Sequence, residues 1–261
     1  MRVLSYIKSE TPKLSSLYRD PFVKLSDNDL TSTGFKGWAT VLLTHGATLG
    51  CWYFETTVCS DDTYWQSSSS NLVDSFCGWN TSLLKTQPHV RVGWSSRYAR
   101  FDEPIGTNQF GVSLRDVDGS VCFNKHRLSY ADIPIESKSV IGCGLILGPC
   151  DIRLPDPRLK PELHPFLENG LLCDPLHPPQ PSTHSLAKIQ YSINGKEFKC
   201  LPLDLPAVMY HPGISLYMKA KCQINIGPEF VYPVPNLASD IQKITGFDSY
   251  RAACYLETPE I

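Results

Sequence analysis

Three short segments between Gly50 and Arg115 constrain the fold of this chain more than any other feature. They are residues 50–55 (GCWYFE), residues 90–95 (VRVGWS), and a turn at 104–106 that leads into residues 109–115 (QFGVSLR). Aromatic and β-branched residues dominate each segment, and polar or small residues interrupt them with a period of two. This pattern is typical of β-strands, so the middle of the chain is predicted to form a sheet.

Further strand-like segments lie on both sides, and residues 138–147 are a nearly continuous apolar run. We expect further strands at residues 22–25, 38–44, 119–124, 138–147, 188–193, 196–198, 214–218 and 222–226. Asp118-Gly119 and Asn194-Gly195 are dipeptides that favour tight turns, and each indicates a β-hairpin. Many short strands joined by turn signals predict an all-β fold, an antiparallel β-sandwich with one core.

The composition is that of an ordinary soluble globular protein. Apolar residues make up 42% of the chain and charged residues 19%, enough of each for a buried core and a hydrated surface. A net charge of −2 predicts no direct binding to nucleic acid or to an anionic membrane surface. The sequence has no apolar run of about 18 residues that could cross a bilayer, and the apolar stretch in residues 1–8 is too short for a signal peptide.

The ten cysteines do not have the spacing of a metal site. No two of them form a C-x-x-C pair, which structural zinc sites commonly use. Cys51, Cys122, Cys143 and Cys222 fall inside strand patterns, where a free thiol behaves as a small core hydrophobe. We therefore expect free thiols, a reducing nuclear or cytosolic compartment, and no metal or other cofactor.

The sequence also lacks the arrangements that are typical of catalysis. The seven histidines are scattered without H-x-x-x-H spacing, and neither a P-loop nor a G-x-S-x-G motif occurs. Carboxylate pairs such as Asp61-Asp62 and Asp102-Glu103 lie in expected loops, as solvated turn residues do. We expect no enzymatic activity and no catalytic residue, and a binding role instead.

The expected organisation is one domain with two insertions. Residues 1–19 are predicted to be an N-terminal arm or a peripheral strand, residues 20–235 the sandwich, and residues 236–261 a C-terminal tail with a weak helical stripe. A serine-rich insertion spans about 59–88 and a proline-rich insertion about 148–184. Proline has no N–H for a sheet ladder, so the second insertion is expected to be a surface loop, either a spacer or a ligand for a proline-reading partner domain.

The order of the motifs resembles one particular family. The motifs are LSDNDL at 25–30, FKGW at 35–38, CWYFETTV at 51–58, RVGW at 91–94, the Asn-Gly turn after Tyr191, and INIGPEFVYP at 224–233. Together they resemble the SPRY (B30.2-like) domain of the absent-small-homeotic-two (ASH-two) family, a subunit of COMPASS-type (MLL-type) histone lysine methyltransferase complexes. The resemblance covers about residues 20–235 without the two insertions. It implies a non-catalytic, nuclear scaffold subunit whose sandwich binds a peptide.

The resemblance also implies a set of partner-binding residues. The family's pocket arginine matches Arg91, the proline of the following turn matches Pro104, the arginine that ends the next strand matches Arg115, and an aromatic residue matches Trp38. Thr107 stands where the family has a tyrosine. The implied ligand is an acidic, aromatic-containing segment of a retinoblastoma-binding-protein-five-like subunit, because guanidinium groups bind carboxylates through charge-assisted hydrogen bonds.

Several alternatives remain open at this stage. Arg91 could instead be a structural arginine at a strand end, paired with a neighbouring carboxylate. Asp116-Val117-Asp118 replaces family lysines, which makes the predicted pocket less basic. A SPRY substrate adaptor for ubiquitin ligation, or another protein-interaction module, is the main rival function, although no SOCS box, RING or B-box is present in the sequence. Contact of the C-terminal tail with a Dumpy-thirty-like dimer is a further partner that the resemblance implies.

Overall fold

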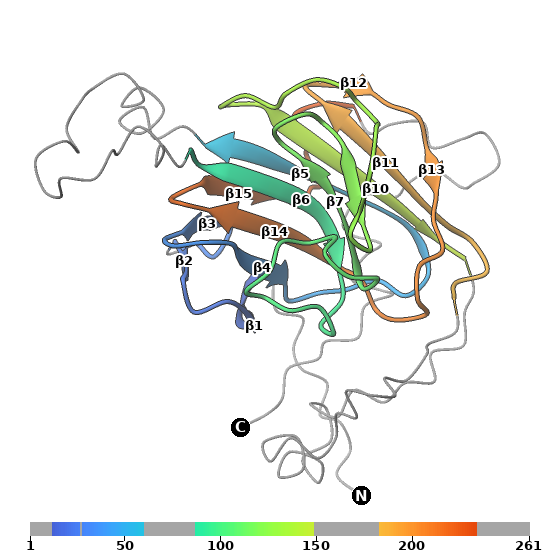
Figure 1. The fold of residues 1–261 in the computed structure, drawn as a ribbon, viewed down its shortest axis with the longest axis horizontal. Coiled ribbons are helices and arrows are strands. Elements are labelled where there is room, and N and C mark those ends of the chain that lie inside the picture. The colour runs from blue at the N-terminus through green and yellow to red at the C-terminus, as the bar shows by residue number, and fades with distance from the viewer. Residues whose placement is uncertain (1–11, 27, 60–86, 149–182, 234–261) are drawn as a thin grey trace, which may run out of the picture.

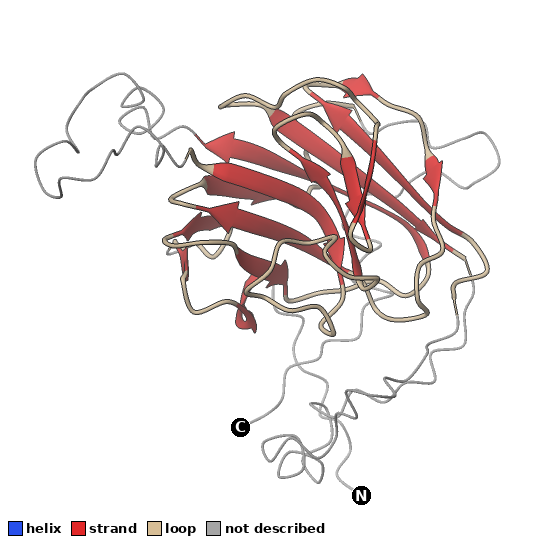
Figure 2. Ribbon diagram, viewed as in Figure 1, coloured by secondary structure: helices blue, strands red, loops and turns tan. Residues whose placement is uncertain are grey.

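The computed structural model describes residues 12–26, 28–59, 87–148 and 183–233. In this part of the chain the regular structure consists of β-strands in two antiparallel sheets, which Figure 1 and Figure 2 show as two layers. The all-β sandwich predicted from the alternating segments is therefore confirmed.

One sheet has seven strands and carries the site described below. Its strands lie in the order β1-β4-β14-β6-β7-β8-β9. They are β1 (Leu14–Arg19), β4 (Ala39–Leu43), β14 (His211–Tyr217), β6 (His89–Ser95), β7 (Gly111–Arg115), β8 (Val121–Phe123) and β9 (His126–Leu128). Because β14 lies between β4 and β6, three segments that are distant in the sequence meet at the centre of this sheet.

The second sheet has eight strands and is built around a long central pair. Its main path runs β12-β11-β10-β5-β15-β3-β2, and β13 also pairs with β11. The strands are β12 (Lys196–Glu197), β11 (Ala187–Ile193), β10 (Val140–Leu147), β5 (Gly50–Cys59), β15 (Lys221–Asn225), β3 (Thr31–Gly34), β2 (Val23–Leu25) and β13 (Leu201–Pro202). β5 and β10 pair in register from Val140↔Thr57 to Leu147↔Gly50.

The core fills the space between the two sheets, and it fixes which residues of β6 face outward. Val90, Val92 and Trp94 are buried core residues, and the Trp94 ring meets Phe54 of β5 edge-on at 5.2 Å. Successive side chains of a strand point to opposite faces. His89 and Arg91 therefore lie on the outer face of the seven-stranded sheet.

The strands that sequence patterning missed are short or polar. β3 (TSTG) contains no large apolar residue, and all three residues of β9 are exposed. The segment predicted as one strand at 119–124 instead ends at Phe123 and turns into β9 through Asn124 and Lys125. Both turn residues have positive φ, of 47° and 66°, as the favoured two-residue hairpin turns require. β1 lies in the stretch expected to be an arm or peripheral strand, and it pairs with β4.

Several other predictions concern segments that the structure describes only in part. The described cysteines are free thiols, with Cys122, Cys143 and Cys222 buried and Cys51 half-buried. Among the described residues, no three His, Cys, Asp or Glu side chains gather as a metal site would need. The same residues include no helix long and apolar enough to cross a membrane. Most of the two insertions, and residues 236–261, lie outside the described residues, so their predicted roles stay predictions.

Candidate interaction pocket

A pocket of about 580 Å³ opens on the outer face of the seven-stranded sheet. It lies where the end of β14, the start of β6 and the end of β7 come together, next to the residue that precedes β4. It is lined by Trp38, Gln87, His89, Arg91, Arg115, Asp116, Val117 and Tyr217.

Strand register explains why three rings meet in this pocket. Tyr217 of β14 pairs with His89 of β6, and Leu216 pairs with Ala39, which places Trp38 next to Tyr217 on the other side. The Trp38 and Tyr217 rings are 5.3 Å apart, and His89 stacks on Tyr217 with 6.1 Å between ring centroids. The rings form a continuous apolar and aromatic wall that can accept a flat or apolar side chain.

The basic part of the pocket comes from one cross-strand pair. Arg91 of β6 and Arg115 of β7 stand directly opposite each other, a pairing of like charges that is unfavourable by itself. Burial lowers the pKa of Arg91, and the nearby charge of Arg115 acts in the same direction. Two guanidinium groups held this close favour a negatively charged ligand between or beside them.

Arg91 also contributes to the fold. Its guanidinium lies over the Trp38 ring, 5.3 Å from the centroid, and its Nη1 donates to the Ile105 carbonyl at 3.3 Å. The alternative reading from sequence paired Arg91 with a carboxylate, whereas the hydrogen bond found here goes to a backbone carbonyl. The side chain is therefore held in place by the loop in front of it, with its position in the pocket fixed before any ligand binds.

That loop, residues 96–110, is attached to the sheet by a chain of hydrogen bonds. The Ile105 N–H donates to Ser215 Oγ at 2.9 Å, and the Ser215 and Thr40 hydroxyls are 2.7 Å apart. Thr40 in turn donates to the Glu103 carbonyl at 2.8 Å, while Ser113 donates to the Ile105 carbonyl at 2.6 Å. Buried hydroxyls from three strands thus fix the backbone to which Arg91 is bonded.

Three of the five residues predicted from sequence come together in the pocket, and two do not line it. Trp38, Arg91 and Arg115 line it, whereas Pro104 and Thr107 lie in the 96–110 loop beside it. The Thr107 hydroxyl donates to the Pro104 carbonyl at 2.7 Å, so it closes the turn rather than facing a ligand. These two residues shape the loop next to Ile105.

The sequence reasoning missed His89 and Tyr217 as pocket residues. The alternation of β6 already places His89 on the face of Arg91, and this signal could have been used. Tyr217 gives no local signal, because only the pairing of β14 with β6 brings it there. His89 is oriented by Asp116, whose Oδ2 lies 3.0 Å from His89 Nδ1 and also accepts from the Val90 N–H at 3.1 Å.

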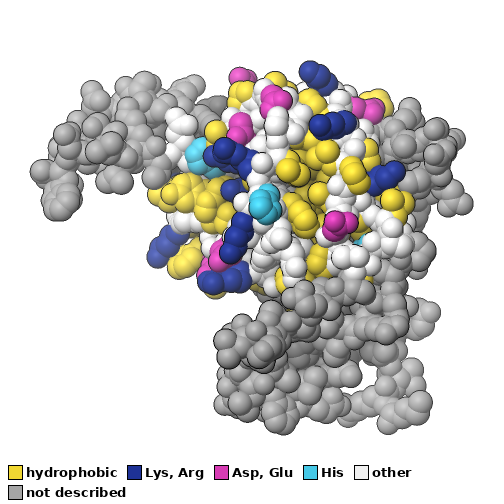
Figure 3. Space-filling view, turned by 45° about the vertical axis from the view of Figure 1, so that its right-hand side comes forward, with side chains coloured by type: hydrophobic (Ala, Val, Ile, Leu, Met, Phe, Trp, Pro, Cys, Tyr) yellow, Lys and Arg dark blue, Asp and Glu magenta, His cyan; other side chains and the backbone are white. Residues whose placement is uncertain are grey.

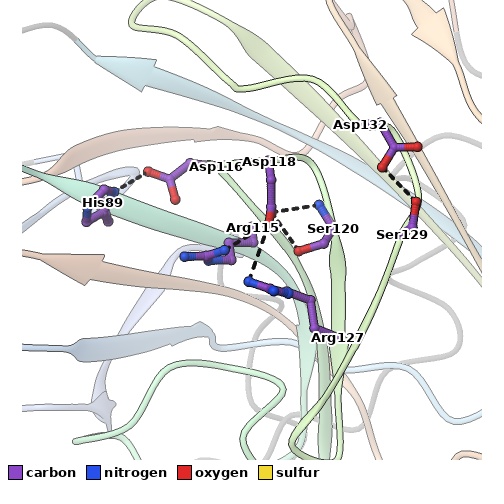
Figure 4. Close-up of polar contacts among 8 residues, drawn as sticks. All are labelled: His89, Arg115, Asp116, Asp118, Ser120, Arg127, Ser129 and Asp132. Carbon is purple, nitrogen blue, oxygen red and sulfur yellow. Dashed lines mark hydrogen bonds and ion pairs between the residues drawn. The ribbon is translucent and has the colours of Figure 1, made fainter.

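Asp118 neutralises part of the basic pocket (Figure 4). Its Oδ2 accepts from Arg115 Nη1 at 2.9 Å and lies 3.6 Å from Arg127 Nη1. Partial burial alone would raise the pKa of Asp118, but hydrogen bonds from Ser120 and the two arginine charges lower it below its usual value. On the face of the molecule in Figure 3, basic, histidine, acidic and hydrophobic side chains likewise lie next to one another rather than in separate regions.

Two curated proteins to which the chain is similar are both named as subunits of Set1/Ash2 histone methyltransferase complexes. The chain is 26% identical over 231 residues to the Set1/Ash2 histone methyltransferase complex subunit ASH2 of Drosophila melanogaster, covering 82% of this chain and 35% of that protein. It is 27% identical over 235 residues to the subunit ash-2 of Caenorhabditis elegans, covering 84% of this chain and 37% of that protein. The chain thus spans about a third of the length of these relatives. The ASH-two resemblance indicated by the motifs is confirmed.

Other comparisons are more distant. No protein-family model matches the chain. Among solved structures it is similar to the SPRY domain of human HERC1, with a TM-score of 0.49, 13% identity, and coverage of 83% of this chain and 99% of that one. A second human SPRY domain gives a TM-score of 0.46, 12% identity, and coverage of 81% and 99%.

Proposed function

We propose that this chain is a non-catalytic, peptide-binding subunit of a nuclear histone lysine methyltransferase complex of the COMPASS type. In this proposal the pocket holds an acidic, aromatic-containing segment of a retinoblastoma-binding-protein-five-like subunit. The observation that carries it is the placement of Arg91 and Arg115 side by side, against Trp38 and Tyr217, in one open pocket. The ASH2 relatives, named as subunits of Set1/Ash2 histone methyltransferase complexes, supply the kind of assembly.

The chemistry of the pocket suits such a ligand. A carboxylate that reaches a guanidinium forms a charge-assisted hydrogen bond, worth about 1.5–3 kcal/mol when water is excluded. An aromatic ligand side chain against Trp38 or Tyr217 adds about 0.5–1.5 kcal/mol beyond its buried area. A segment that combines both groups uses both halves of the pocket, which a purely acidic or purely apolar segment does not.

Calorimetric titration of the partner peptide against wild type and Arg115→Ala tests the proposal. Arg115 is the better probe of the two arginines, because it bonds the side chain of Asp118, whereas Arg91 also bonds the backbone of the 96–110 loop. We expect Arg115→Ala to weaken binding by about 1.5–3 kcal/mol and to leave the unfolding transition almost unchanged.

Lys24→Ala is the matched control, since it removes one positive charge from an exposed position on β2, in the other sheet. It should change the binding free energy by less than about 0.5 kcal/mol. Equal affinities for wild type and Arg115→Ala would show that the pocket is not part of the binding surface.

A contact of residues 236–261 with a Dumpy-thirty-like dimer belongs to the same proposal. It is supported by the ASH-two resemblance alone, because these residues lie outside the described part of the chain. Removing residues 236–261 should abolish that contact and leave binding of the acidic peptide intact.

A further inference from the structure

The turn between β7 and β8 holds one carboxylate against two arginines (Figure 4). Asp118 Oδ2 accepts from Arg115 Nη1 at 2.9 Å and lies 3.6 Å from Arg127 Nη1. Its other oxygen, Oδ1, accepts from the Ser120 N–H at 3.1 Å and from the Ser120 hydroxyl at 2.6 Å. The two oxygens thus have separate tasks, one in shaping the turn and one in neutralising the arginines.

The arginines that Asp118 contacts belong to a row on the outer face of the sheet. Arg127 of β9 pairs with Cys122 of β8, and Cys122 pairs with Ser113 of β7. Ser113 and Arg115 are two residues apart and share a face, which is also the face of Arg91. Arg127 therefore continues the line that Arg91 and Arg115 begin.

Exposure increases along this row. Arg91 is half-buried, the Arg115 side chain is 27% exposed, and the Arg127 side chain is 62% exposed. Asp118 sits between the last two, with 39% of its side chain exposed. A carboxylate arriving from solution would meet Arg127 and Arg115 at the position that Asp118 now occupies.

We propose that Arg91, Arg115 and Arg127 form one track for an acidic peptide segment, and that Asp118 is an internal competitor for it. The inference rests on the proposed function and deepens it. A ligand carboxylate replaces Asp118 at Arg115 and so exchanges one ion pair for another, which gains less than binding to an arginine without a partner would. Asp118 therefore lowers the affinity of the pocket for weakly acidic segments and selects those with several acidic residues in a row.

Asp118→Asn tests this directly, because the change separates the two tasks of the side chain. The amide oxygen of asparagine can still accept from Ser120 and keep the turn, while the amide nitrogen cannot accept from Arg115 or Arg127. Asp132→Asn is the matched control. Asp132 is exposed, bonds the Ser129 hydroxyl at 2.7 Å, and has a φ of 53° that asparagine tolerates. Asp132→Asn changes the net charge by the same amount as Asp118→Asn, but at a position away from the arginine row.

The measurement is fluorescence anisotropy with a labelled synthetic peptide that contains a run of aspartates and glutamates and one phenylalanine. We expect Asp118→Asn to bind this peptide about two- to fivefold more tightly than wild type, the range expected from removing a competing exposed ion pair. Asp132→Asn should match wild type within about 1.5-fold, the part due to net charge alone. Adding Arg127→Ala to Asp118→Asn should cancel about half or more of the gain.

Unchanged or weaker binding by Asp118→Asn would overturn the role of Asp118 as a competitor. If adding Arg127→Ala to Asp118→Asn left the affinity unchanged, Arg127 would not be part of the track. Both results differ from a failure of the proposed function, in which the peptide would not bind wild type or would bind Arg115→Ala equally well.

Discussion

At the scale of single residues, Arg91 shows how one side chain serves both the fold and the pocket. Its guanidinium is half-enclosed, lies over Trp38, and donates to the Ile105 carbonyl, so truncation removes a hydrogen bond and packing as well as a charge. An Arg91→Ala variant is therefore expected to lose stability and affinity together. Arg115 and Asp118 interact through their side chains at the surface. Substitutions at these two residues are therefore expected to change affinity with less effect on stability.

His211 is the residue with the clearest consequence for stability. It is fully buried, and its Nδ1 donates to the Leu43 carbonyl at 3.0 Å. Burial, helped by the charge of Arg97, lowers the pKa of His211 to about 3. In the unfolded chain the same group takes up a proton below a pH of about 6.5. Because His211 stays neutral in the folded state in this range, its contribution to stability is constant above about pH 6.5 and decreases as the pH falls from there toward 3.

The size of this effect is set by the linkage relation. The His211 contribution approaches about 1.4 kcal/mol per pH unit between the two pKa values. Urea unfolding of wild type and His211→Asn from pH 7 to pH 4.5 measures it, since asparagine can still donate to the Leu43 carbonyl but does not titrate. The variant should be less stable at pH 7 and should have the shallower pH slope. Equal slopes would mean that His211 is not held neutral in the folded protein.

At the scale of elements, the 96–110 loop matters most, because its Ile105 carbonyl accepts the hydrogen bond that holds Arg91 in the pocket. Ser215 is the central link, since its buried hydroxyl accepts from Ile105 N–H and contacts Thr40. Replacing it by alanine leaves the Ile105 N–H without an acceptor, which costs about 1–3 kcal/mol of unfolding free energy. Affinity for the acidic peptide should fall as well, because Arg91 is bonded to the same residue.

Ser32→Ala is the natural comparison for Ser215→Ala. Ser32 is equally buried, but its hydroxyl has no hydrogen-bond partner among the described residues. Removing an unsatisfied buried hydroxyl is expected to be neutral or stabilising. Denaturant unfolding of the two variants would contradict this account if both lost the same amount of stability.

The elements also show what the sequence can predict and what it cannot. Strands rich in aromatic and β-branched residues, such as β5 and β6, follow from the residue pattern, and so does the continuous apolar run of β10. The alternation at the start of β6 also gives the outward face of Arg91. β3 and β9 do not, because neither contributes large apolar residues to the core. The pocket was only partly predictable for a different reason. Trp38, His89 and Tyr217 meet through the pairing of β4, β14 and β6, which no local pattern encodes.

At the scale of the whole molecule, the sandwich closes without the proline-rich insertion. The Gly148 N–H donates to the Leu186 carbonyl at 2.6 Å, and Thr183 forms a β-bridge with Pro206, so the chain is already paired on both sides of residues 149–182. Deleting residues 156–182 should keep a single cooperative melting transition. Loop-closure entropy changes by only about 0.6 kcal/mol per doubling of length. Loss of that transition would show that the insertion is part of the core.

The most direct test of the central claim is quantitative affinity purification of the tagged chain from native nuclei. We predict that wild type and Lys24→Ala recover the subunits of a histone methyltransferase complex in equal amounts. Arg115→Ala should recover clearly less of the subunit that carries the acidic segment, since a loss of 1.5 kcal/mol or more raises the dissociation constant at least about tenfold. Equal recovery with Arg115→Ala, or recovery of ubiquitin-ligase subunits in place of the methyltransferase complex, would contradict the account.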